Sequence, residues 1–190
     1  MPKHVDHDQR RDELAAAVWR LVVREGVEAA SLRRVAAEAG WSVGSVRHYF
    51  AAQHELLAFA MELVVTRATE RIQRTPAGAD MHATAAALLG QLLPLDDERR
   101  AEMQVWLAFS TRAAVDPALR PLRDEAHAAI AGLCRRIAHD LGASDPDLTG
   151  TELHALADGL ALQGVLTPQA LPPARIEAIL AARLKELTTR

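Results

Sequence analysis

The residues with the most potential for chemistry lie on a short predicted helix near residue 45. Val46 and Phe50 have helical spacing and are expected to point inward. The opposite side carries small and polar residues, namely Gly44, Ser45, Arg47 and His48. An arginine can donate two hydrogen bonds to the edge of a guanine, and small residues beside it allow close approach to a DNA major groove. The segment therefore favours nucleic-acid recognition.

Two preceding helices are predicted to position this segment. Ser31 can cap a helix whose inward positions are Leu32, Val35, Ala36 and Ala39. Gly40 ends that helix, and Trp41 and Ser42 supply a short turn before the next one. An amphipathic first helix is expected from Gln9 to about Arg24, after a tail over residues 1–9. Residues 10–50 thus predict three helices that include a helix-turn-helix.

The same segment resembles the DNA-binding domain of the TetR family of bacterial transcriptional regulators. The shared features are the capped helix, Ala36-x-x-Ala39-Gly40, the turn, a short helix ending in Tyr49-Phe50, and then Glu55-Leu56-Leu57. The resemblance implies that Val43, Gly44, Ser45 and Arg47 face base edges, with Arg33 close by. It also implies contacts to the DNA backbone. These would come from Ser31, Trp41, His48 and Tyr49. Ser42 and Gln53 are further candidates for DNA binding, but Gln53 replaces the lysine that usually contacts a phosphate in the family, so one charged contact is missing.

Bulk charge supports DNA binding only weakly, since the net charge is −3. Residues 1–50 hold eight Lys/Arg against seven Asp/Glu, whereas the remainder holds fourteen against eighteen. The asymmetry has the sign expected for a DNA-binding N-terminal part. The prediction therefore rests on geometry and motif.

Enzyme classes with recognisable motifs are not favoured. The sequence has no HExxH, no CxxC, no glycine-rich phosphate loop and no G-x-S-x-G. We expect no catalytic residues, no cofactor and no metal site, and Cys134 cannot form an internal disulfide because it is the single cysteine. No signal peptide or apolar run of about 18 residues is present, so a cytoplasmic protein without membrane contact is expected.

The predicted fold is all-α, with about nine helices. Aromatic residues make up only 4% of the chain, and Ala and Leu dominate the apolar set, which favours helices over strands. We expect a helix-turn-helix domain over residues 1–52. A long connecting helix, from about Gln53 to Arg74, then leads into a helical ligand-binding and dimerisation domain over residues 53–190.

Apolar and amphipathic residues of the second domain predict a small-molecule cavity between the connecting, sixth and seventh helices. The candidates are Met61, Val65, Met103, Trp106, Phe109, Arg112 and His127. Arg112 or His127 would anchor a polar group of the ligand. The alternative is that most of these residues belong to an ordinary core.

The last two helices are predicted to pair with those of a second subunit, as the family resemblance implies. The candidate interface residues are Leu153, Leu156, Leu160, Gly164, Ile176, Leu180 and Leu184. The C-terminal half is also loosely similar to BetI-related regulators. These observations together predict a dimeric repressor that a small molecule releases from a palindromic operator in double-stranded DNA. The alternative is a helical protein-binding adaptor that does not bind DNA.

Overall fold

The computed structural model describes residues 7–187, apart from the side chains of residues 7, 8, 12, 27 and 53. These described residues form nine α-helices, two 3₁₀ turns and no strand. The α-helices are α1 (His7–Glu25), α2 (Leu32–Ala39), α3 (Val43–Arg47), α4 (Gln53–Arg74), α5 (Met81–Gly90), α6 (Asp97–Val115), α7 (Arg120–Asp140), α8 (Pro146–Leu166) and α9 (Pro173–Leu187). The 3₁₀ turns are η1 (Val27–Ala29) and η2 (Pro117–Leu119). The predicted all-α class is confirmed. The predicted tail lies outside the described residues over 1–6.

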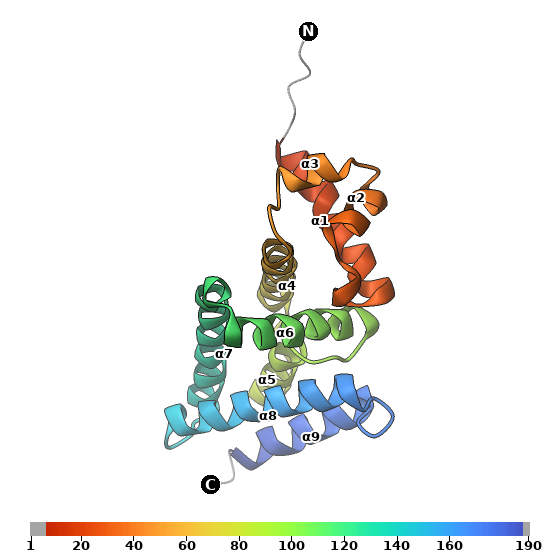
Figure 1. The fold of residues 1–190 in the computed structure, drawn as a ribbon. Helices are drawn as coiled ribbons and strands as arrows, with labels where there is room; N and C mark the ends of the chain where they lie inside the picture. Colours follow the sequence, from red (N-terminus) through yellow and green to blue (C-terminus); the bar gives the residue numbers. More distant parts are fainter. Residues whose placement is uncertain (1–6, 188–190) are drawn as a thin grey trace.

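Figure 1 shows the helices α1–α3 at one end of the molecule and α8 and α9 at the other. The long α4 runs between the two ends (Figure 1). No helix among residues 7–187 is both long and apolar enough to span a membrane.

Aspartates begin several of the helices. The side chains of Asp80, Asp96 and Asp145 accept hydrogen bonds from the backbone N–H three residues later, at the N-termini of α5, α6 and α8. Asp116 caps η2 in the same manner, through the N–H of Ala118. The start of α4 differs because its N-cap is Ala52, and the Glu55 carboxylate instead accepts the N–H of Ala51 at 2.7 Å.

The first of two hydrophobic cores does not end at the predicted domain boundary near residue 52. It contains Leu14 and Val18 of α1, Val46 of α3, Leu56 of α4 and Phe109 of α6. Helix α6 contacts both α1 and α4. The helix-turn-helix unit, residues 7–50, therefore shares its core with the helices that follow it.

The second core is formed by α5, α7, α8 and α9, and it overturns the predicted residues of the dimer interface. Five of them are buried within a single chain, namely Leu153, Leu160, Ile176, Leu180 and Leu184. Leu156 is half-buried against the same core. A Cβ added at Gly164 would come within 2.8 Å of Ile176 and 2.7 Å of Pro94, so this glycine serves packing inside the chain. The five buried side chains are covered by their own chain and are not on a surface that meets a second subunit, whereas the half-buried Leu156 stays a candidate.

Candidate nucleic-acid interface and ligand cavity

The helix-turn-helix has the geometry that its sequence predicts. Ser31 caps α2, and Gly40 ends it with a φ of +70°, a left-handed conformation that glycine adopts without strain. The Ser42 hydroxyl caps α3 by accepting the N–H of Ser45 at 3.0 Å. Val46 is fully buried, and Phe50 packs on Phe59 of α4 with ring centroids 5.0 Å apart. The buried side of α3 thus fixes the direction of its outer side.

The structure brings most of the predicted DNA-contacting residues to the surface of this unit. The exposed ones are Arg33, Ser42, Val43, Gly44, Ser45, Arg47 and His48. Ser31, Trp41 and Tyr49 are half-buried. Gln53 is the first residue of α4, but its side chain lies outside the described part of the structure.

Trp41 is held between a second aromatic ring and a cation. Its ring centroid lies 5.8 Å from that of Tyr49, and the guanidinium carbon of Arg10 lies 5.2 Å above the Trp41 ring. Arg10 is thereby brought from α1 to the start of α3. The sequence offers only its positive charge as a signal, because the contact joins residues 31 positions apart.

Ion pairs occupy several of the other N-terminal arginines. Glu38 accepts hydrogen bonds from Arg24 and Arg20, which lower the pKa of its carboxyl group to about 2. Glu25 pairs with Arg34 and Arg24, and Glu62 pairs with Arg11.

Most of these pairs join one helix to another, and together they leave few cations for a partner. Within residues 7–187, neither Arg33 nor Arg47 forms an ion pair. The positive charge available to DNA is therefore concentrated on α2 and α3, with Arg10 beside them.

A cavity of about 330 Å³ lies between α4, α6, α7 and α8, and its wall is mostly apolar. Met61 and Trp106 come from the first core, whereas Leu133 and Ala157 come from the second. Two further wall residues, Met103 and Ile130, pack against both cores. The cavity therefore lies where the two cores meet.

The predicted cavity residues divide into two groups. Met61, Val65, Met103 and Trp106 all line this cavity. The other three do not, and their placement there was wrong. Phe109 lies one turn from Trp106 in the same first core, but it is fully buried and is not part of the cavity wall.

Arg112 and His127 also lie outside the cavity wall. Arg112 lines a separate hollow beside η1 and α4, and its guanidinium lies 3.7 Å from the carboxylate of Asp116. His127 lies behind Trp106, with ring centroids 5.0 Å apart. Neither side chain is therefore part of the cavity wall in this structure.

Charged residues of the wall supply polarity that the sequence analysis did not predict. They are Arg99, Glu102, Arg136 and Asp158. Glu102 is 5% exposed, and burial raises the pKa of its carboxyl group. Arg71 forms a bidentate pair with Glu102 and also donates to the carbonyl oxygen of Gln91 at 3.1 Å.

The thiol of Cys134, the single cysteine, lies close to the cavity but has the low reactivity of a buried thiol. Cys134 is fully buried. Burial raises the pKa of its thiol to about 11, and the nearby Asp158 carboxylate contributes to the increase. The thiol is therefore protonated at neutral pH, as expected for a core cysteine.

The outer side of α8 carries an exposed apolar stripe. Leu148, Leu162 and Leu166 are 59%, 41% and 66% exposed, and with Ala155 and Gly159 they follow helical spacing along one side. Small exposed residues of α9 lie at the same period, namely Ala174, Ala178 and Ala182. The last two helices thus have apolar residues on their outer sides as well as in the core.

An exposed helix-turn-helix joined through a shared core to a helical domain with a cavity defines the class of helix-turn-helix regulators. Comparison with known sequences identifies the family. Residues 14–60 match the family described as bacterial regulatory proteins, tetR family, and residues 81–189 match the BetI-type transcriptional repressor, C-terminal family. The chain belongs to the TetR family of transcriptional regulators, and such proteins are not enzymes. Both predicted resemblances are confirmed.

Individual relatives agree over nearly the whole chain. The HTH-type transcriptional regulator PksA of Bacillus subtilis is 37% identical, over 98% of this chain and 94% of its own length. A transcriptional regulator from Rhodococcus superposes with a TM-score of 0.84 at 32% identity, covering 94% of this chain and 96% of that one. The multidrug binding protein EbrR, solved in complex with ethidium, has a TM-score of 0.69 at 28% identity, covering 92% of this chain and 98% of that one.

Proposed function

We propose that the protein is a dimeric repressor that binds a palindromic operator and is released from it by a small molecule. The observation that carries the proposal is the position of the cavity. Its wall combines residues of the second core with Met61 and Trp106 of the core that the helix-turn-helix unit shares. A ligand that fits one arrangement of these cores better than another would change the affinity for DNA, and a coupling of about 1–3 kcal/mol gives roughly a 5- to 150-fold effect.

Base recognition is assigned to α3. Arg47 and Ser45 are exposed on the side opposite the buried Val46, and Gly44 adds no side chain that would hold the helix away from the groove. Arg33 and Arg10 would supply charge to the phosphates. Few positively charged side chains of the described helix-turn-helix unit are free of ion pairs. Contacts to bases, and the binding of two half-sites about 34–36 Å apart by one dimer, would therefore supply much of the affinity for DNA.

Selection of bound duplexes from a random pool tests this function directly. We expect a palindromic sequence, because two symmetric subunits present two α3 helices. Binding should weaken steeply as salt rises. An adaptor without DNA binding would enrich no sequence at any salt concentration. The selected duplex then serves to screen for molecules that release it.

Replacement of Arg47 by alanine is expected to cost about 1–3 kcal/mol of binding, roughly 5- to 150-fold, and to relax specificity at one base pair. A mobility-shift titration on the selected duplex measures both effects. Arg34→Ala is the matched control, because Arg34 is also exposed but already pairs with Glu25. Equal affinities of the Arg47→Ala variant and the wild-type protein would contradict the assignment of Arg47.

The apolar stripe on α8 is the proposed surface for the second subunit. It replaces the buried residues that the sequence predicted, and the small exposed residues of α9 would allow the paired helices to approach closely. The same two helices remain the interface, but their outer sides form it. In a dimer with a two-fold axis, each residue of the stripe would lie close to the same residue of the second subunit, or to a stripe residue one helical turn away.

The double variant Leu162→Glu/Leu166→Glu is therefore expected to be monomeric where the wild-type protein is dimeric. Like charges brought together in an apolar contact weaken the association of the subunits by several kcal/mol. Because both subunits carry the substitutions, each new charge is present twice in the interface. Sedimentation velocity measures the mass. Val115→Glu is the control, since Val115 is 73% exposed at the end of α6, away from the stripe. If the double variant kept the mass of a dimer, the interface would lie elsewhere.

The ligand class follows from the cavity wall. A largely apolar molecule of moderate size suits Met61, Met103 and Trp106, and the carboxylate of Glu102 in the wall is available to a polar group of the ligand. The complex of the relative EbrR with ethidium supports this class. Release of the selected duplex, together with a change in Trp106 fluorescence, would mark a molecule that acts through the cavity.

A further inference from the structure

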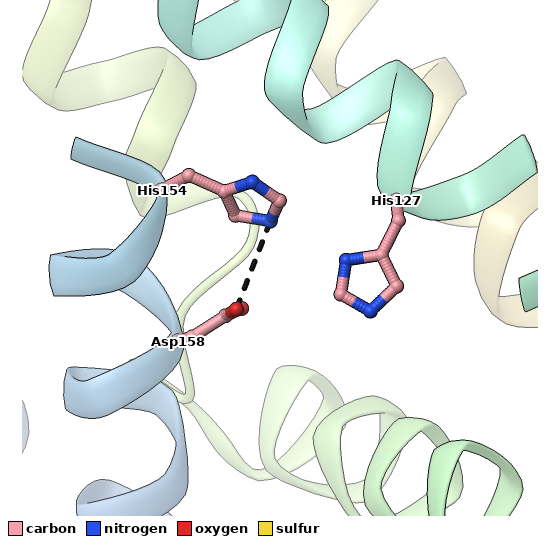
Figure 2. Close-up of side chains that lie close together, drawn as sticks. All are labelled: His127, His154 and Asp158. Carbon is pink, nitrogen blue, oxygen red and sulfur yellow. Dashed lines mark ion pairs between the residues drawn. The ribbon is translucent and has the colours of Figure 1, made fainter. Parts of the chain in front are cut away.

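Two histidines and an aspartate come together where α7 faces α8. His127 belongs to α7, whereas His154 and Asp158 lie one turn apart on α8 (Figure 2). Each residue offers one ligand atom, and these three atoms all lie within 4.8 Å of one another. No metal site was expected here, since the two histidines are 27 positions apart and form no metal-binding motif.

We propose that His127, His154 and Asp158 bind a divalent transition-metal ion of the Zn²⁺ type, which joins α7 to α8 beside the cavity. Two imidazoles and one carboxylate are the ligand set of three-residue zinc sites, in which a water or another donor fills the fourth position. The set does not suit Mg²⁺ or Ca²⁺, because these ions prefer oxygen ligands.

The distances require only a small contraction. Ligand atoms about 2.0–2.1 Å from a tetrahedral ion lie roughly 3.4 Å apart. The Nε2 atom of His154 is already 3.7 Å from a carboxylate oxygen of Asp158. A rotation of the His127 side chain would bring its nitrogen into range, and Figure 2 shows this ring facing the other two side chains.

The polar atoms of the cluster lack better partners. The Nε2 atom of His154 is buried, and among the described residues no hydrogen bond reaches it. The 3.7 Å separation from Asp158 exceeds a hydrogen bond, so a buried nitrogen remains unsatisfied. A metal ion would use the lone pair of this nitrogen and would neutralise the Asp158 carboxylate.

The position of the cluster relates it to the cavity. Asp158 lines the cavity wall, and the His127 ring lies 5.0 Å from that of Trp106 between centroids, tilted by 58°; Trp106 also lines the cavity. The His127 and His154 rings lie 5.5 Å apart between centroids. An ion bound here would fix the α7–α8 side of the wall and present its fourth coordination position close to the cavity.

The test is a titration of the full-length, DNA-free protein with ZnCl₂, followed by calorimetry. We expect one ion per chain, and no comparable binding of Mg²⁺ or Ca²⁺. Replacing one of the metal-binding residues, in His127→Ala or His154→Gln, should lower the affinity for Zn²⁺ by at least about 10–100-fold. Loss of a residue that only hydrogen-bonds to a metal ligand already lowers metal affinity by this amount. His139→Ala is the matched control, because His139 is also on α7 but lies beside Asp140 on the exposed surface.

Substitution by Co²⁺ identifies the ligands independently of affinity. A four-coordinate site with nitrogen and oxygen donors gives visible absorption without a thiolate charge-transfer band. Appearance of that band would assign the ion to Cys134 and overturn the proposed ligand set. Zinc binding that the His127→Ala/His154→Gln double variant retained in full, or no binding to the folded wild-type protein, would also overturn it. None of these outcomes depends on DNA binding, so failure here leaves the proposed function intact.

Discussion

Replacement of Arg71 by methionine is expected to lower the free energy of unfolding by about 3–5 kcal/mol, because it leaves the buried Glu102 carboxylate without its cation. In the wild-type protein the guanidinium of Arg71 donates to both oxygens of Glu102. The carboxylate otherwise faces the largely apolar cavity wall. For a chain of this size, such a loss corresponds to a fall in melting temperature of roughly 6–20 °C.

The pH dependence of this variant gives a second test with a definite sign. Burial raises the pKa of Glu102, whereas the Arg71 charge lowers it. Without Arg71 the pKa of the folded state rises further above that of the unfolded chain. A group with a raised pKa contributes stability below its unfolded pKa and loses it as the pH rises through the folded value. The deficit of the variant relative to wild type should therefore be smaller near pH 5 than near pH 8.

Two further variants separate the buried charge from other effects. Arg74→Met removes an arginine from the same helix, but its partner Glu70 is exposed, so a change below about 1 kcal/mol is expected. The double variant Arg71→Met/Glu102→Leu removes both charges and should regain most of the lost stability. Urea unfolding measures the free energy of unfolding of all three variants. A double variant as unstable as Arg71→Met would show that packing by the arginine stem, rather than the buried charge, explains the loss.

The sequence predicts helix ends well where the signal is local. Asp80, Asp96 and Asp145 begin helices because a cap involves residues three positions apart. The bounds of α4, Gln53–Arg74, also match the predicted ones. The helix-turn-helix is predictable because buried and exposed positions alternate clearly around Val46.

Helix α8 shows why the side that a helix presents to its neighbours is harder to predict. It carries leucines around most of its circumference, including Leu153 and Leu160 in the core and Leu162 and Leu166 outside. Periodicity alone cannot tell which leucines face the chain's own core and which face a second subunit. The residues that the sequence predicted for the dimer interface therefore lie mostly on the inward side of the two helices, and the outer side is the proposed interface.

Residues far apart in the sequence escaped prediction altogether. His127 and His154 meet only because α7 packs on α8, and Arg10 meets Trp41 only because α1 packs beside α3. On α6, Trp106 and Phe109 are three positions apart and were assigned to one cavity. Both belong to the core that contains the helix-turn-helix unit, but only Trp106 reaches the cavity, whereas other side chains cover Phe109 completely.

Replacement of Phe109 by alanine tests whether the helix-turn-helix unit and α6 unfold together. Phe109 is fully buried, and its loss should cost about 3–5 kcal/mol through the lost burial and the space left behind. Because the same core contains Leu14 and Val46, we expect faster amide exchange in α1 and α3 as well as in α6. Hydrogen exchange read by mass spectrometry gives the change for each helix.

Leu184→Ala is the matched control for this experiment, because Leu184 is equally buried but belongs to the second core. It should speed exchange in α5, α8 and α9 while leaving α1 largely protected. If Phe109→Ala instead affected α6 alone, the helix-turn-helix unit would be an independent domain ending near residue 52. Faster exchange in both regions would mean that α6, whose Trp106 lines the cavity, is stabilised together with the helix-turn-helix unit, so that a ligand in the cavity would contact a helix of that shared core.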